Sequence, residues 1–334
     1  SPLDYDLGAK LEFHQDKRTN RELHVTLQPE ANFGVGENLE LGIEGIFTFT
    51  GAKIGGFGQS RIFGGLKPYL TYNAGSFQAI AGLQANVYNN NADSSGQSLF
   101  VPHLELRARV LPQELTVFLG HTGGLQYNRY SDLIRINPYL SDNVTIRPTL
   151  EKTNLYAGVS GQIPNLLDYN AKVSYRRIEN ALIHQVPVDG AYFTLGYDSL
   201  MTVFGIHLEV NHDLLKNVKI GAALDVNNYT TNTLADNFHA PPLQLTAFGE
   251  YGKDKLTART EVNFFGSTPM TINNENIVEN RPVFIDINLG ADYQLTPQFS
   301  VWAEVNNLLS TNYQRWWNYT ERPLDVKAGL TLGF

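Results

Sequence analysis

The chain contains no cysteine, so it forms neither disulfide bonds nor thiolate metal sites. It also lacks any run of about 18 apolar residues, which a membrane-spanning helix would need, and its mean hydropathy is −0.24. Basic residues are not in excess: the net charge is −8, which disfavours nonspecific binding to nucleic acid because that binding needs a basic surface. No apolar segment of the signal-peptide type follows Ser1, so we expect a processed chain or one that was never exported.

Helical periodicity is nearly absent as well, and alternation takes its place. In the stretch VFIDINLGADYQL (283–295), every odd-numbered residue is apolar, whereas aspartate, asparagine and glutamine occupy most even positions. Similar alternation recurs at 6–14, 22–33, 104–110, 218–226, 256–264 and 324–334. This period of two is typical of β-strands with one apolar face. Such strands occur on a soluble core or in a membrane barrel, with lipid outside and water inside.

The connections between these stretches alternate between short and long. Short ones, rich in turn-forming residues, lie at 34–38, 73–76, 111–114, 164–168, 214–217, 252–255 and 295–298. Longer polar stretches fall at 89–98, 129–143, 230–242 and 266–282. Short turns on one rim and long loops on the other are typical of an outer-membrane barrel. We therefore predict an all-β fold: one transmembrane antiparallel β-barrel domain over residues 1–334, of about sixteen strands, with short periplasmic turns, long extracellular loops and both termini on the short-turn rim.

A soluble β-sandwich is the alternative to this barrel. Sandwiches are usually built from shorter strands, whereas here the polar face persists over nearly every strand and carries charges of both signs. In lipid, only a closed barrel pairs all backbone groups, and sixteen strands would enclose a water-filled lumen. The aromatic residues would suit girdles at the two membrane interfaces, a set that comprises Tyr293, Phe299, Trp302, Trp316, Trp317, Tyr319 and Phe334.

The last two strands carry a more specific pattern. The stretch VWAEVNNLLSTNYQRWWNYTERPLDVKAGLTLGF (301–334) has the pattern residues Val305, Asn306, Asn307, Leu308, Leu309, Tyr313, Trp317, Tyr319 and Arg322. It resembles the end of TonB-dependent receptor barrels, where a penultimate strand, an aromatic-rich loop and a final strand ending in phenylalanine follow one another. The resemblance implies an outer-membrane location in a Gram-negative-type bacterium, and it makes Phe334 the terminal insertion signal.

This sequence also differs from the receptors that it resembles. Such receptors have 22 strands, a globular plug domain and a TonB box, whereas this sequence predicts about sixteen strands and shows nothing like a plug. Active, TonB-coupled import is therefore in doubt. A plugless relative and a piece of a longer receptor, with plug and TonB box upstream of Ser1, are both compatible with the pattern.

Charged residues of both signs lie on the face predicted to line the lumen. Interleaved charges set a transverse field in an open pore or cross-link its wall, and the carboxylate excess predicts at most a weak preference for cations. The predicted lumen charges are Lys10, Glu12, Glu44, Lys67, Glu105, Arg107, Arg109, Lys172, Arg176, Glu209, Arg259, Glu261, Asp286, Glu304 and Lys327.

One long connection, LQYNRYSDLIRINPYL (125–140), is unusually rich in apolar and aromatic residues. Such density marks a binding surface or a loop that folds into the lumen; a self-packed loop is the plain alternative. Folding inward would constrict a channel, and facing outward would suit a protein or glycan partner. The residues of this possible constriction or partner loop are Tyr127, Arg129, Tyr130, Leu133, Arg135 and Tyr139.

No pattern in the sequence predicts an enzyme, a metal site or a cofactor. His207 and His212 lie five apart, on opposite faces of a strand, which is wrong for one metal ion. Asp132, Asp236 and His239 fall in outer loops without the spacing of a triad. The loop NNNADSSGQ lacks ordered calcium-ligand spacing.

The sequence therefore predicts a porin-like or TonB-dependent-receptor-like barrel for passage of small solutes across the outer membrane. The alternative is a non-conducting barrel subunit that anchors partner proteins in a larger envelope complex. Expected partners are membrane lipid and lipopolysaccharide, with envelope proteins as further candidates, but no nucleic acid.

Overall fold

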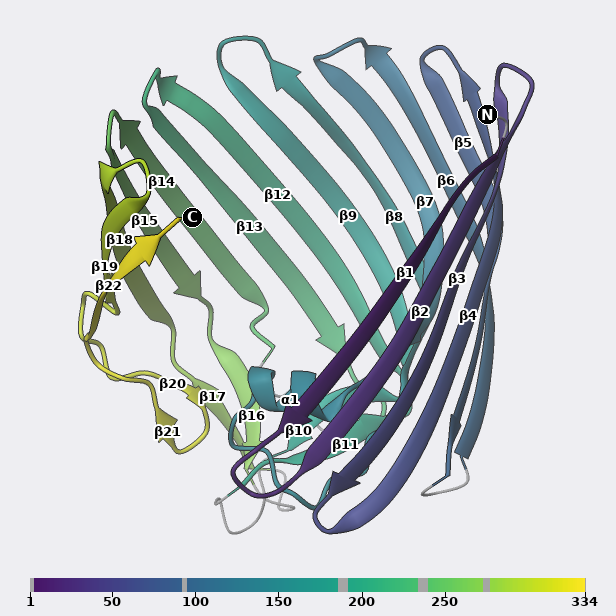
Figure 1. Cartoon of the computed structure of the whole chain (residues 1–334), viewed down its shortest axis with the longest axis horizontal. Helices are drawn as coiled ribbons and strands as arrows, with labels where there is room; N and C mark the ends of the chain where they lie inside the picture. Colours follow the sequence, from purple (N-terminus) through teal and green to yellow (C-terminus); the bar gives the residue numbers. More distant parts are fainter. Residues whose placement is uncertain (1–2, 92–94, 186–191, 234–239, 273–276, 334) are drawn as a thin grey trace.

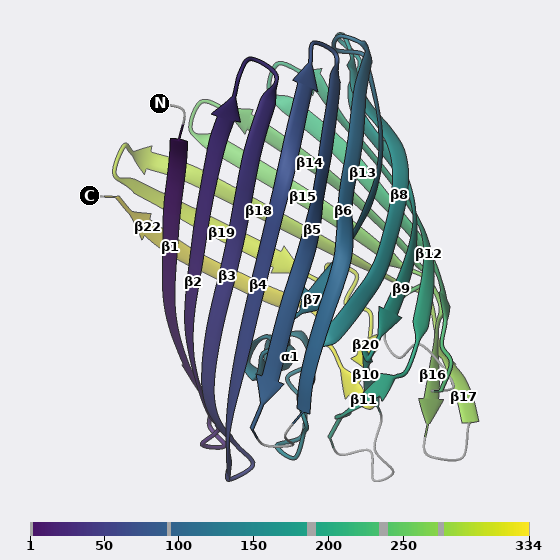
Figure 2. The same ribbon diagram turned by 90° about the vertical axis from the view of Figure 1, so that its right-hand side faces the viewer.

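The fold is one large antiparallel sheet that curls around a lumen (Figures 1 and 2). A computed structural model describes residues 3–91, 95–185, 192–233, 240–272 and 277–333. The sixteen strands of the sheet follow one another in chain order. They are β1 (Leu3–Gln15), β2 (Arg21–Val35), β3 (Leu39–Ile54), β4 (Phe57–Ala74), β5 (Phe77–Asn90), β6 (Ser95–Leu111), β7 (Leu115–Gln126), β8 (Thr149–Ile163), β9 (Leu167–Glu179), β12 (Met201–Leu215), β13 (Val218–Thr230), β14 (Leu243–Lys253), β15 (Leu256–Phe265), β18 (Phe284–Thr296), β19 (Phe299–Asn306) and β22 (Asp325–Leu332). The predicted fold class and strand number are confirmed.

The long connections contain small elements that the sequence pattern did not predict. They are α1 (Tyr130–Ile136) and three two-stranded hairpins, formed by β10 (Ala181–Gln185) with β11 (Thr194–Asp198), β16 (Thr268–Ile272) with β17 (Ile277–Arg281), and β20 (Gln314–Trp316) with β21 (Tyr319–Thr320). In contrast, the long loop expected at 89–98 is shorter, because β5 continues to Asn90 and β6 begins at Ser95. Within the described residues, no helix is both long and apolar enough to cross a membrane.

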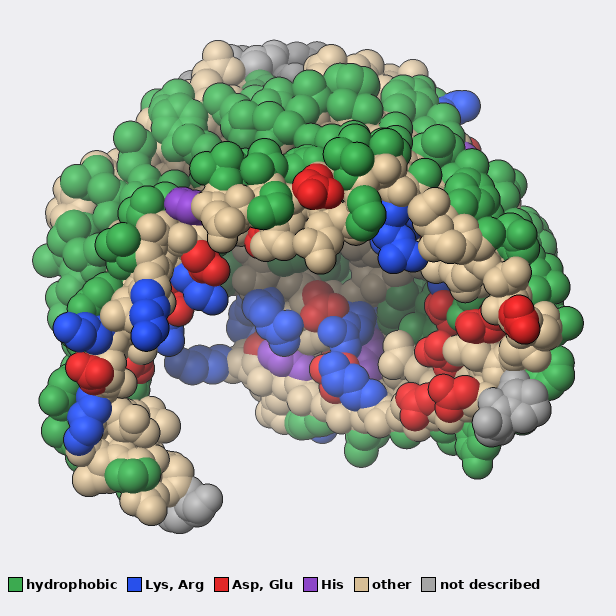
Figure 3. Space-filling model, turned by 90° about the horizontal axis from the view of Figure 1, so that it is seen from above, with side chains coloured by type: hydrophobic (Ala, Val, Ile, Leu, Met, Phe, Trp, Pro, Cys, Tyr) green, Lys and Arg blue, Asp and Glu red, His purple; other side chains and the backbone are tan. Residues whose placement is uncertain are grey.

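The apolar face of the sheet points outward and the polar face points into the lumen (Figure 3). On the outer face, Leu11 is 71% exposed and Leu330 is 68% exposed, whereas Glu22 and Arg61, on the inner face, are completely buried. This is the reverse of a soluble domain, whose apolar residues are buried. The arrangement excludes the sandwich alternative and is that of a strand wall between lipid and water.

All seven predicted short turns lie on one rim of the sheet, at the top of Figure 1. Two of them place glycine in the left-handed region, Gly36 with φ of 77° and Gly75 with φ of 58°, where a side chain would be strained. The first and last described residues of the chain also lie at this rim. Leu3 pairs with Phe33, and the Gly333 N–H donates to the Gln298 carbonyl. The long connections and their hairpins gather at the opposite rim.

The first and last strands form the two ends of the sheet. Among the described residues, β1 pairs with β2 alone and β22 pairs with β19 alone. Figure 3, which looks along the lumen from the short-turn rim, shows the wall interrupted between these two strands. In lipid, backbone groups along such edges need partners.

Candidate functional site in the lumen

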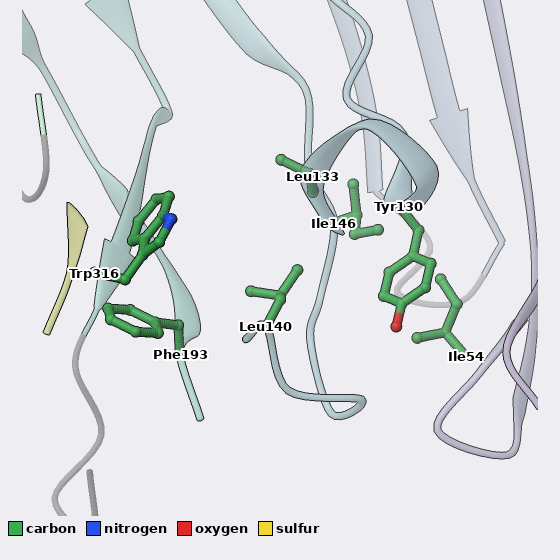
Figure 4. Packing of buried hydrophobic residues seen from close by; sticks show 7 residues of the cluster. All are labelled: Ile54, Tyr130, Leu133, Leu140, Ile146, Phe193 and Trp316. Carbon is green, nitrogen blue, oxygen red and sulfur yellow. The ribbon is translucent and has the colours of Figure 1, made fainter. Parts of the chain in front are cut away.

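The connection between β7 and β8 folds into the lumen at the long-loop rim, and we call residues 127–148 the cap. Its helix α1 buries Tyr130 completely and leaves Leu133 only 4% exposed. These side chains belong to an apolar cluster drawn in Figure 4, which comprises Ile54, Tyr130, Leu133, Leu140, Ile146, Phe193 and Trp316. Of the inward, outward and self-packed dispositions left open by the sequence, the structure shows a loop that turns inward and packs against residues of other segments (Figure 1).

A buried carboxylate holds the start of α1 against the wall. Glu22 on β2 accepts hydrogen bonds from the backbone N–H groups of Tyr130 (3.1 Å) and Ser131 (2.9 Å). Negative charge at a helix N-terminus is favourable because the free N–H groups there carry partial positive charge. Arg61 on β4 pairs with Glu22 at 2.5 Å and also donates to the Asn128 carbonyl at 2.7 Å. The same ion pair thus joins two strands to the cap.

Further contacts tie the cap to neighbouring strands. Arg129 forms an ion pair with Glu12 on β1 and a two-point contact with Asp132. Its hydrogen bond with Asp132, and next the one with Glu12, outweigh burial and raise the pKa of the Arg129 guanidinium above its usual value. The Tyr127 hydroxyl donates to Thr50 on β3.

We call the opening of the lumen at the long-loop rim the mouth. The other end of the cap contacts loops on the opposite side of this mouth. The Tyr139 and Tyr319 rings stack with centroids 3.4 Å apart, and Leu140 forms an isolated bridge with Phe193. Phe193 and Trp316 pack edge to face. The cap therefore crosses the long-loop mouth, from the β1–β4 wall to the connection between β19 and β22.

Of the other cap residues that the sequence singled out, Arg135 remains on the surface, with 77% of its side chain exposed. Asp132, considered for a catalytic triad, pairs with Arg129 in the cap, whereas Asp236 and His239 lie outside the described residues.

The predicted lumen charges lie on the inner wall, and many form ion pairs there. Three pairs join two predicted members: Lys10–Glu12 at 3.0 Å, Lys67–Glu44 at 2.6 Å and Arg107–Glu105 at 3.4 Å. Three more join a predicted member to another carboxylate: Arg176–Glu151, Arg259–Asp292 and Lys327–Asp325. Each exposed pair is worth about 0–1 kcal/mol, so they shape the wall more than they stabilise it.

The remaining predicted charges are spread over separate parts of the wall. Arg109 donates to the Gly75 carbonyl at the short-turn rim, and Glu209 lies 3.7 Å from His207. Lys172 lines a hollow of about 430 Å³ with Arg176. Glu261 and Glu304 line another hollow, of about 710 Å³, with Arg259. Both hollows are open parts of the lumen wall.

A third cavity, of about 490 Å³, lies at the mouth, and we call it the mouth cavity. Its walls are more apolar and aromatic than those of the other two. Its ionisable members are His184, Glu261, Arg281, Asp286 and Arg315, and its aromatic members are Tyr229, Phe265, Phe284, Tyr313 and Trp316. Three of these rings form a stack, since Phe284 lies 4.6 Å from Phe265 and 4.2 Å from Tyr313, centroid to centroid. A cavity with apolar walls and a few convergent polar groups is the usual form of a ligand site.

Asn307, part of the pattern in the C-terminal strands, sets the path of one wall of this cavity. Its φ of 50° lies in the left-handed region, which asparagine tolerates better than most residues. Its side-chain amide donates to the carbonyls of Thr311 and Arg322, and its Oδ1 accepts from the Thr311 N–H. These bonds close the chain that carries Tyr313 and Trp316 into a compact loop.

Four aromatic residues expected at the membrane interfaces lie elsewhere, and two of them, Trp317 and Tyr319, pack against the apolar cluster of the cap. Trp316 is only 5% exposed because it packs in the apolar cluster of the cap, and Trp302 faces the lumen, where it lines the hollow beside Glu304. Alternation could not place Trp316, because this residue lies in a long connection, whereas the inward position of Trp302 follows from its alternation with Val301 and Ala303. The predicted terminal signal, Phe334, lies outside the described residues.

Comparisons with known proteins show no match to a protein-family model or to a curated protein. Solved structures do match. The FrpB iron transporter from Neisseria meningitidis (F5-1 variant) gives a TM-score of 0.71 at 14% identity, covering 99% of this chain and 60% of its own. The ferric-catecholate import receptor Fiu from E. coli K12 gives 0.67 at 11% identity, covering 95% and 55%. The ferripyoverdine receptor of the Pseudomonas aeruginosa outer membrane gives 0.66 at 13% identity, covering 99% and 53%.

In its fold, the chain is similar to the barrels of these receptors and transporters. At these identities the likeness is one of fold. The receptor-like barrel spans between 53% and 60% of the length of the three matched chains. The resemblance carried by residues 301–334 is thus confirmed at the level of the fold.

Proposed function

We propose that this receptor-like barrel lies in the outer membrane of a Gram-negative-type bacterium and lets small solutes pass through its lumen, with the cap as a constriction at the long-loop mouth. The observation that carries the proposal is the inward fold of the cap inside a polar lumen. The apolar outer face would contact lipid, and the long-loop rim would contact lipopolysaccharide. The named transporters and receptors among the matched structures support passage rather than an enzymatic role.

The register of the wall allows the cap to be removed cleanly. Gln126 and Thr149 lie directly opposite each other on β7 and β8, so residues 127–148 can be replaced by a two-residue Asn-Gly turn, which suits antiparallel strands. Conductance of the purified chain and of this variant would be measured in a planar lipid bilayer. A control variant, Glu44→Gln, removes one partly buried pair of the lumen wall, that of Glu44 with Lys67.

We expect small or infrequent steps from the natural chain and larger, more stable steps from the variant without the cap. The control should conduct like the natural chain. If both the natural chain and the capless variant are folded but silent, the passage function is wrong. The alternative, a barrel that anchors envelope proteins, would then be tested by identifying proteins that co-purify with it. Equal conductance with and without the cap would contradict its role as the constriction.

A further inference from the structure

We propose that the mouth cavity binds a small zwitterion with an aromatic or apolar body, such as a short peptide with free ends, placing its carboxylate on Arg281 and its ammonium group on Asp286. This inference rests on the proposed function, because it names the class of solute that would enter the lumen. It depends on two polar groups of opposite sign at the same cavity, which the sequence pattern alone did not bring together.

Arg281, at the end of β17, is a buried cation whose hydrogen-bond partners among the described residues are neutral groups. Its side chain donates to the Arg315 carbonyl at 3.1 Å and to the Thr268 hydroxyl at 2.8 Å. The residue is 3% exposed, and its Nε has no hydrogen-bond partner among the residues that the structure describes. Within the described part of the chain, no carboxylate lies within ion-pair distance of it. Burial, and then the neighbouring charge of Arg315, lower the pKa of Arg281 to about 10. An anion in the cavity would supply the missing counter-charge.

Asp286, which lies on a strand of the barrel wall, provides a negative charge at the same cavity. On β18, its Oδ2 accepts a hydrogen bond from Asn288 at 3.0 Å, while its buried Oδ1 has no partner among the described residues. The other carboxylate of the cavity, Glu261, already accepts from Asn263 at 2.6 Å. A buried carboxylate oxygen without a donor is costly. An ammonium group carries three donors, so it would pair with the Asp286 carboxylate, whose side chain is partly exposed and lines the cavity.

The charge balance of the cavity favours a zwitterion over a simple anion. Two arginines, Arg281 and Arg315, face two carboxylates, Glu261 and Asp286, among the lining residues. His184, the fifth ionisable residue, is neutral near pH 7 because burial lowers its pKa to about 4. The lining therefore carries two charges of each sign and is neutral overall. A ligand with one charge of each sign matches this balance.

The wall near these two groups is aromatic. Phe284 lies next to Arg281, whose guanidinium carbon is 5.1 Å from the ring centroid. Tyr313 stacks on Phe284 and lies in the field of Asp286; burial first, and then that charge, raise its pKa to about 12. An apolar or aromatic ligand body would gain contact area against these rings. The volume of about 490 Å³ falls in the usual range for small-ligand pockets, roughly 300–1,000 Å³.

Three peptides of nearly equal size test the contribution of each ligand charge separately. They are L-Phe-L-Phe with free ends, its N-acetyl form, which lacks the ammonium group, and its C-terminal amide, which lacks the carboxylate. Binding to the detergent-purified full chain would be measured by isothermal titration calorimetry at pH 7. We expect the free dipeptide to bind at least about tenfold more tightly than either derivative, because each derivative leaves one buried group unpaired.

Variants assign each charge to its residue. In Arg281→Met, the free dipeptide and its amide should bind about equally, while the N-acetyl form remains weaker. In Asp286→Asn, the free dipeptide and the N-acetyl form should bind about equally instead. A matched control, Asp292→Asn, removes a carboxylate from the lumen hollow of about 710 Å³ and should change none of these binding ratios. Folding of each variant is checked by its heat-modifiable mobility on gels.

Equal binding of all three peptides to the natural chain would overturn the proposal, and so would the absence of any binding. A variant that loses all three peptides equally would overturn its assigned role. If Arg281→Met does not fold, the peptide series on the natural chain and on Asp286→Asn still decides the question. The proposed function fails separately: a silent chain in the bilayer experiment that still shows these binding ratios has the site but no passage.

Discussion

Arg61 Nη2 lies 2.5 Å from Glu22 Oε1, with both side chains completely buried against the start of the cap helix. The carboxylate meets a positive end of a helix and a guanidinium at once, so its charge is compensated on two sides. Removing one member of a buried pair leaves the other uncompensated, which costs more than the pair itself contributes. This relationship makes the cap sensitive to single substitutions in the wall.

Glu22→Gln is expected to release α1 from β2. The neutral amide still occupies the space, but Arg61 then stays buried without its counter-ion, a loss of about 3–5 kcal/mol. Hydrogen exchange measures this directly, because the Leu133 and Asn137 amides bond within α1. Their protection should fall roughly 100-fold or more.

The double variant Glu22→Gln with Arg61→Met is the control for this prediction. It removes both charges and should restore much of the protection, since no buried charge is then left without its counter-ion. Glu44→Gln, which breaks a partly buried pair with Lys67 on the lumen wall, should change protection by less than about 1 kcal/mol. Unchanged exchange in Glu22→Gln would show that the apolar cluster alone holds the cap.

Acid should loosen the loops at the mouth through His184. Burial lowers the pKa of His184 from 6.5 to about 4 in the folded chain. Above pH 6.5 the ring is neutral in both states and costs nothing. As the pH falls from 6.5 towards 4, the unfolded loop binds a proton that the folded one does not, and stability falls by up to about 3 kcal/mol.

Trp316 reports this change, because its ring lies 5.0 Å from that of His184, edge to face. Its fluorescence, recorded in a variant with Trp302 and Trp317 replaced by phenylalanine, should shift towards that of exposed tryptophan below about pH 6. His184→Leu should abolish the shift between pH 6.5 and 4. A shift that persists in His184→Leu would assign the acid response to another group.

Asn307 contributes to the mouth cavity in two separable ways. Asn307→Gly keeps access to the left-handed backbone but loses the side-chain bonds to Thr311 and Arg322. Asn307→Ala loses both, and the left-handed conformation adds about 1–2 kcal/mol. We therefore expect faster hydrogen exchange over 311–322 in both variants, with the larger increase in the alanine variant. Equal exchange in the two would mean that the backbone conformation is not under strain.

The sequence predicted the wall well because its signal is local. Alternation assigns each strand residue to a face, so the outward Leu11 and the inward Glu12 follow from two neighbouring letters. The turns follow from short polar segments with residues such as Gly36 and Gly75, whose left-handed backbone explains their presence. Even the strand number comes from counting such segments.

The side-chain contacts inside the mouth could not be predicted from alternation. Glu22 and Arg61 look like any other lumen charges; only the path of the cap, which starts more than sixty residues downstream of Arg61 in the chain, buries them. Arg281 and Asp286 meet at one cavity because the loop closed by Asn307 covers β18. Such contacts depend on how loops fold over one another, and periodicity carries no information about that. The apolar density of residues 125–140 was the one signal, and it left the direction of folding open.

Because the apolar face of the sheet points outward, we expect arginine to destabilise the barrel at one of two adjacent residues of β14 and not at the other. Ala247 lies between Ala222 and Val262 on the outer face, whereas Thr246 points inward and bonds Asn263. Ala247→Arg would place a charge against lipid, at a cost of about 2–4 kcal/mol near the midplane. Thr246→Arg would place the same side chain in a wet lumen beside carboxylates such as Glu261, at little cost. Urea titration of the two variants in liposomes, followed by the gel shift of folded barrels, should therefore show a lower midpoint for Ala247→Arg alone. Equal midpoints would mean that the outer face of β14 does not contact lipid, and the transmembrane orientation of the wall would have to be abandoned.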